Sequence, residues 1–180
     1  MDTGGLVVLL LLGGSLAAAC AGWVRRAAWV AAPLALAGLA LAAALASASE
    51  RVHVDGRAQV TVLVVLAGAL AVAGGGPLAS RVFVLVDGRE RGARQGSMRR
   101  AGEVLRGGAW IGALERAGIF ASLVAGWPEG LAIVLGLKGL GRYPELRNQE
   151  RTGAAERFII GTFTSVLWAA ACAGVVRLLA

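Results

Sequence analysis

The strongest constraint on the fold is a pair of apolar stretches near the N-terminus that contain no charged residue. Residues 4–24 form the first and residues 27–48 the second, with Arg25 and Arg26 between them. A helix needs roughly 20 mostly apolar residues to cross the hydrocarbon core of a bilayer, which is about 30 Å thick. Both stretches therefore predict membrane-spanning helices. The first is interpreted as a retained helix, because a signal peptide would begin with basic residues.

The overall composition supports a membrane protein. Hydrophobic residues make up 57% of the chain and charged residues only 16%, whereas soluble domains have about 45–50% and about 25%. The net charge of +7 comes almost wholly from arginine. Because the arginines fall in gaps between apolar stretches and not along one helix face, we exclude nucleic acid as a partner. The abundance of alanine, glycine and arginine favours a bacterial protein of the cytoplasmic membrane.

Four further segments complete the expected architecture. Residues 60–85 predict a third spanning helix, in which the Gly74–Pro77 cluster is expected to kink or end the helix. Residues 109–126 and 158–179 predict two more. Residues 130–141 are too short to span alone, so this segment either borrows the turn that follows or re-enters the membrane.

The predicted fold is an all-α, polytopic membrane helical bundle of about six membrane segments, three before and three after a polar loop. Three units are expected: a three-helix apolar scaffold (1–85), an arginine-rich cytoplasmic loop (86–108) and a three-segment unit with a charged cluster (109–180). Residues 81–106 contain seven arginines and 142–157 four. Because cytoplasmic loops carry excess basic residues, these segments are expected in the cytoplasm and both termini outside.

Two adjacent charged residues, Glu115 and Arg116, lie inside one of the predicted spans. A charge at the bilayer centre costs about 2.5–3.5 kcal/mol on insertion scales, so intramembrane charges pair with other groups. A tight turn joins this span to the next segment, which places Glu115 at a depth similar to Lys138 and Arg142. We therefore expect Glu115 to contact one of these two cations, and Arg116 to turn toward Glu145 or Glu156.

Further ionisable and hydroxyl-bearing residues gather at the same membrane level. They define a candidate ligand-binding or ion-pair site, which comprises Glu115, Arg116, Lys138, Arg142, Glu145, Glu156, Arg157, Thr162 and Ser165. The sequence offers no metal-ligand spacing and no established catalytic motif. Catalytic residues therefore stay unassigned, and neither a metal nor a cofactor is expected.

Three sequence segments of the C-terminal part carry a resemblance to a known family. The segments "IGALERAGIF", "LKGLGRYPEL" and "AAERFIIGTFTS" resemble motifs of an uncharacterised family of bacterial membrane proteins, domain of unknown function 3307. The resemblance covers residues 110–180 only, and it brings kinship without an established activity. The matching positions are Glu115, Arg116, Lys138, Arg142, Glu145, Glu156, Gly161, Thr162 and Ser165.

Three functions are compatible with these features. The first is binding of an anionic lipid headgroup or small anionic ligand at the charged site, with transport as an extension. The second is an intramembrane enzyme acting on a lipid-linked substrate, with Glu115 or Glu145 as general base. The third is a structural or assembly subunit of the membrane. Membrane lipids are the expected partners, and self-association or a membrane protein partner is left open.

Overall fold

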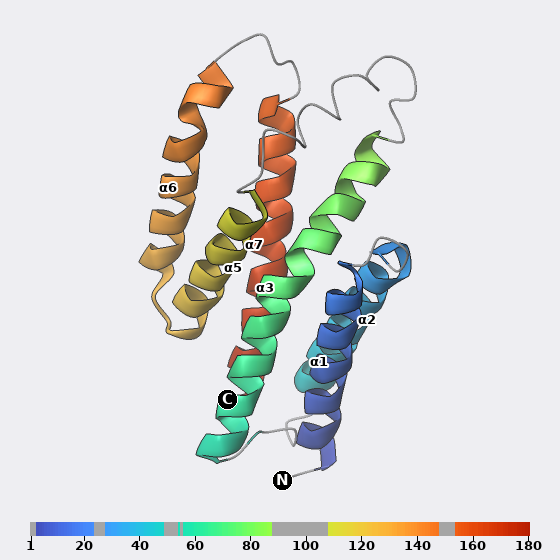
Figure 1. The fold of residues 1–180 in the computed structure, drawn as a ribbon. Helices are drawn as coiled ribbons and strands as arrows, with labels where there is room; N and C mark the ends of the chain where they lie inside the picture. Colours follow the sequence, from blue (N-terminus) through green and yellow to red (C-terminus); the bar gives the residue numbers. More distant parts are fainter. Residues whose placement is uncertain (1–2, 24–27, 49–53, 55, 88–107, 148–153) are drawn as a thin grey trace.

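The computed structural model describes residues 3–23, 28–48, 54, 56–87, 108–147 and 154–180. These residues form six helices (Figure 1), which confirms the predicted all-α bundle. The expected arginine-rich loop lies mostly outside the described residues. The helices are α1 (Thr3–Ala21), α2 (Ala28–Ala48), α3 (Arg57–Asp87), α5 (Gly108–Val124), α6 (Pro128–Arg147) and α7 (Ala154–Leu179).

The two longest helices, α3 and α7, pack against each other in antiparallel directions at the centre of the bundle (Figure 1). Helices α1 and α2 form a hairpin on one side, with α1 packed on α3 and α2 packed on both central helices, while α5 packs on both from the other side. Helix α6 lies at the edge and packs chiefly on α5. The backbone N–H of Val54, which precedes α3, donates to the carbonyl of Leu179 at the end of α7 (3.1 Å). The start of α3 and the end of α7 therefore lie together.

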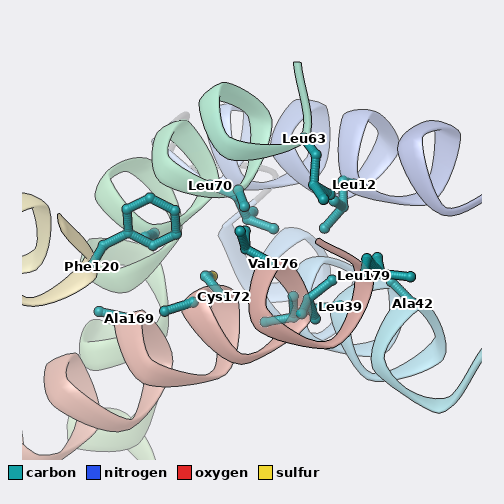
Figure 2. Close-up of a cluster of buried hydrophobic side chains, with 14 of the residues drawn as sticks. Leu12, Leu39, Ala42, Leu63, Leu70, Phe120, Ala169, Cys172, Val176 and Leu179 are labelled. Carbon is teal, nitrogen blue, oxygen red and sulfur yellow. The ribbon is translucent and has the colours of Figure 1, made fainter. Parts of the chain in front are cut away.

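The core lies where α1, α2, α3 and α7 meet, and it is built from leucine, valine and many alanines (Figure 2). Helices in lipid gain nothing from hiding apolar surface alone, so they associate through close packing of small residues. Fully buried Ala42, Ala67 and Ala71 allow such close approach. The large apolar side chains on the outer faces, including Leu10 and Leu167, are two-thirds exposed. This distribution suits a bundle surrounded by lipid.

Four of the described helices, α1, α2, α3 and α7, are long and apolar enough to cross a membrane. Helix α5 has 17 residues, which span about 25 Å at 1.5 Å per residue. Helix α6 has 20 residues and extends through Pro144 to Arg147, so residues 130–141 belong to a longer helix that includes the turn that follows, one of the two expected outcomes. A proline in the last turns of a helix removes a single helical hydrogen bond.

Helix α3 also continues through its proline, contrary to one of the two outcomes expected for the glycine cluster. Because Pro77 has no N–H, the carbonyl of Ala73 lacks its usual helical donor. The indole Nε1 of Trp23, just beyond α1, donates to this carbonyl (3.0 Å). A hydrogen bond from another helix therefore satisfies the group that the proline leaves open.

This arrangement gives a first prediction. Trp23→Phe is expected to lower the free energy of unfolding by about 0.5–1.5 kcal/mol, the net contribution of one hydrogen bond. In a Pro77→Ala background the loss should be smaller, because the substituted alanine would supply the N–H for the Ala73 carbonyl. Equilibrium unfolding in mixed micelles measures both, with Trp110→Phe as an exposed control. Equal losses in the two backgrounds would contradict the explanation.

Candidate functional site

An ion pair joins α5 to α6 and forms the centre of the candidate site. The Lys138 ammonium donates to Glu115 Oε2. The two side chains are only 16% and 11% exposed, respectively. The prediction that Glu115 faces a cation on the following segment is therefore confirmed, with Lys138 as its partner.

The turn between the two helices explains why these residues meet. Gly126 has a φ of 70°, the left-handed conformation that commonly closes a helix. The N–H of Trp127 donates to the Ser122 carbonyl (2.8 Å), and Pro128 then begins α6 at a position where its missing N–H has no consequence. Such a short connection holds α5 and α6 antiparallel, so residues roughly equally far from the turn become neighbours.

Arg116 lies on a different face of α5 and contacts α3. Successive helix residues point about 100° apart, so when Glu115 faces α6, Arg116 faces elsewhere. The Arg116 side chain is 4% exposed, and its Nε and Nη2 donate to the Val72 carbonyl at 3.1 and 2.8 Å. Arg116 thus binds a backbone group of α3, and the expected contact with Glu156 was wrong. The side chain of Glu145, the other expected partner, lies outside the described residues.

Three consecutive glycines of α3 make room for this contact and for two others. A Cβ added at Gly75 would lie closer than 3.0 Å to the Arg116 side chain, and one at Gly74 equally close to Trp168. At Gly76, a Cβ would lie 3.0 Å from the Trp23 ring. Arg116 and both indoles donate to α3 carbonyls, and the Trp168 acceptor is that of Leu70 (3.1 Å).

Sequence reasoning missed this use of the glycines. The cluster was interpreted as a kink or an end of the helix, both of which concern the helix itself. The cluster provides a flat helix surface, so that large donors from α5, from α7 and from Trp23 just after α1 reach the carbonyl oxygens of α3. The combination of three glycines and a proline in one span with tryptophan and arginine in others is the signal that could have indicated it.

Two phenylalanines, which the sequence did not single out, accompany the cations of the site. The Lys138 ammonium lies 5.9 Å from the ring centroid of Phe158 in α7. The Arg157 guanidinium lies 5.6 Å from that of Phe83 in α3. Cations within about 6 Å of an aromatic face are attracted by the ring, so these rings help to hold charges that lie close to lipid.

The remaining predicted residues are dispersed around this centre. Arg142 is half-buried, one helical turn beyond Lys138. Ser165 is buried in α7, and the Thr162 hydroxyl is buried without a hydrogen-bond partner. Glu156 is exposed at the start of α7, so the structure does not bring it into the group. Glu145 lies in α6, but its side chain is outside the described residues.

The fold and these contacts define a helical membrane bundle with a buried ion pair and a buried arginine on one helix. Comparison with known proteins gives no match: no family model, no curated protein and no solved structure matches the chain. The three charged side chains at its centre are the cations Arg116 and Lys138 and the anion Glu115. The chemistry that this arrangement favours is the binding of a negative group.

Proposed function

We propose that the chain is an integral membrane protein that binds an anionic group, either a lipid headgroup or a small acid, beside Lys138 between α5, α6 and α7. The observation that carries this proposal is the charge balance of the buried trio. Glu115 pairs with Lys138, whereas Arg116 donates to a neutral carbonyl. The trio therefore has a net charge of +1, which is costly in a low-dielectric region, and an anion beside Lys138 would bring this net charge to zero without contacting Arg116 itself.

The position of the site suits a ligand from the cytoplasmic leaflet. Lys138 and Arg142 are four residues apart and share a face of α6. Arg142 lies toward the end of the bundle where α3 ends and α7 begins, the end that the arginine-rich segments assign to the cytoplasm. Basic pockets between helices on that side commonly bind lipid headgroups. The same site would also serve for transport of a small acid. Separately, we propose that residues 110–180 are related to the family that their motifs resemble.

The structural alternative is favoured by one specific observation. Glu115 and Arg116 connect α5 to two different helices, since one pairs with Lys138 of α6 and the other donates to Val72 of α3. Such contacts would hold α5 in place without any ligand. The enzymatic alternative has no comparable support, because the Glu115 carboxylate already accepts a hydrogen bond from Lys138 and the side chain of Glu145, the other candidate base, lies outside the described residues.

Native mass spectrometry of the protein purified in mild detergent tests the proposal. The wild type is expected to retain an anionic phospholipid or a small acid, and Lys138→Gln to lose it. Arg177→Gln, at the exposed far end of α7, is the matched control and should retain it. Adducts of phospholipid mass indicate a headgroup, and light adducts that exchange with buffer indicate a free acid.

A second variant guards against misfolding of the first. Glu115→Leu combined with Lys138→Met replaces the ion pair with apolar groups, a change that buried pairs often tolerate. This variant should fold and carry no anion. If it or folded Lys138→Gln retains as much anion as the wild type, the binding proposal is wrong and the structural alternative stands.

A further inference from the structure

The Thr162 hydroxyl has an unusual environment in α7. Within the described ranges, Thr162 Oγ1 is the one buried side-chain nitrogen or oxygen atom without a hydrogen-bond partner. A buried hydroxyl that forgoes its hydrogen bonds is destabilising, and in hydrocarbon no water replaces the missing partner. Such an orphaned group in a native structure calls for a physical reason.

Five other hydroxyls in the described helices show a local hydrogen bond that Thr162 does not make. Serine and threonine in helices can donate to the carbonyl four residues earlier. Thr164, two residues away in the same helix, does so with Ile160 (2.8 Å). The carbonyl of Phe158 is available to Thr162 at the same offset, yet Thr162 makes no such bond. The same local bond is made by Ser15, Thr61, Ser80 and Ser122.

The location of Thr162 connects it with the charged site. Thr162 follows Phe158 by four residues, so both lie on one face of α7. The Phe158 ring is the one that faces the Lys138 ammonium. The hydroxyl therefore lies on the same face of α7 as Phe158, one helical turn further along, and the Phe158 ring is 5.9 Å from the cation that the proposed function assigns to the anion. Helix α6 packs chiefly along α5 and has little contact with α7 across the described segments.

We propose that Thr162 donates its hydroxyl hydrogen to the anionic group held by Lys138, so that the site selects an oxyanion such as a phosphate or carboxylate. This inference rests on the proposed function and deepens it. An oxyanion presents several acceptor oxygens and can accept from the ammonium and the hydroxyl together. A halide, with one atom, would have to contact both donors from a single position. The hydroxyl is left without a local bond because its partner is the ligand.

The test compares Thr162→Val with Thr164→Val. Both substitutions replace a hydroxyl with a methyl group of similar size, on the same helix. Binding is measured in lipid nanodiscs as phosphatidylglycerol is titrated against phosphatidylcholine, and separately with inorganic phosphate. Thr162→Val is expected to weaken binding about tenfold, the effect of one hydrogen bond to a charged acceptor. Thr164→Val should bind as the wild type does. Response to phosphatidylglycerol alone identifies a headgroup site, and response to phosphate as well identifies a site for free oxyanions.

Thermal melting without anionic ligand gives an independent readout. Thr162→Val should melt at the same temperature as the wild type or higher, because it removes an unsatisfied buried hydroxyl. Thr164→Val should melt no higher than the wild type, since it loses a made hydrogen bond. Wild-type binding by Thr162→Val, or a lower melting temperature, overturns the hydroxyl inference. If Lys138→Gln binds as well as the wild type, the proposed function itself fails.

Discussion

Replacing Glu115 with leucine is expected to lower the free energy of unfolding by about 3–5 kcal/mol, the usual effect of removing one member of a buried ion pair. Both side chains of the Glu115–Lys138 pair are largely buried, and the substitution leaves the ammonium without an anion in an apolar region. Unfolding by a denaturing detergent in mixed micelles measures the loss. Glu129→Leu is the matched control, because Glu129 is exposed in the first turn of α6, and its loss should stay below about 1 kcal/mol.

The double variant Glu115→Leu/Lys138→Met decides whether this loss comes from the pair. Apolar replacement of both partners is often neutral or stabilising, so the double variant should be more stable than Glu115→Leu alone. The two single effects would then fail to add, as expected for residues in direct contact. Additive losses would show that each side chain acts through other contacts.

The same variants separate a binding site from a purely structural network. If an anion binds beside Lys138, anionic lipid can supply the negative charge that Glu115→Leu removes. Added phosphatidylglycerol should then stabilise Glu115→Leu, since a ligand that binds only the folded state raises its stability. The double variant, which has no lysine at this position, should show no such gain. Equal responses of both variants would favour the structural alternative.

The helices could be predicted from the sequence because a helix that crosses a lipid bilayer needs a continuous run of about 20 mostly apolar residues. The expected span 27–48 is found as Ala28–Ala48, and 109–126 as Gly108–Val124. The pairing of Glu115 with Lys138 was predictable for a related reason. An isolated carboxylate in hydrocarbon is costly enough that the nearest cation across a short turn becomes its partner.

The other contacts of the site could not be predicted, because they depend on backbone groups and on helix orientations that the residue types do not reveal. The acceptor for Arg116 is the Val72 carbonyl, and every residue has a carbonyl, so no residue pattern distinguishes the one that will be used. The continuation of α6 through Pro144 to Arg147 also had no signal in the residue pattern, because the residue before a proline favours an extended conformation. The contact of Lys138 with Phe158 likewise requires knowing which face of α7 turns toward α6.

Gly75→Ala is expected to cause the second large loss, through the surface where Arg116 meets α3. The new methyl would lie closer than 3.0 Å to the Arg116 side chain, and overpacking of this kind costs about 1–3 kcal/mol. Displacing Arg116 would also remove its hydrogen bonds to Val72, each contributing about 1.5–3 kcal/mol for a charged donor. The expected loss of unfolding free energy is therefore about 3 kcal/mol or more.

The matched control is Gly14→Ala on α1, where an added Cβ meets nothing within 4 Å. Alanine favours helix over glycine by about 0.5–1 kcal/mol, so this variant should be as stable as the wild type or more stable. The two substitutions thus have opposite expected signs, although both replace a glycine inside an apolar helix. If Gly75→Ala is also neutral or stabilising in equilibrium unfolding, then Arg116 can leave α3 at little cost. The hydrogen bonds to the Val72 carbonyl would then contribute little to keeping the Arg116 guanidinium buried. Arg116 could no longer be counted in the net charge that supports anion binding.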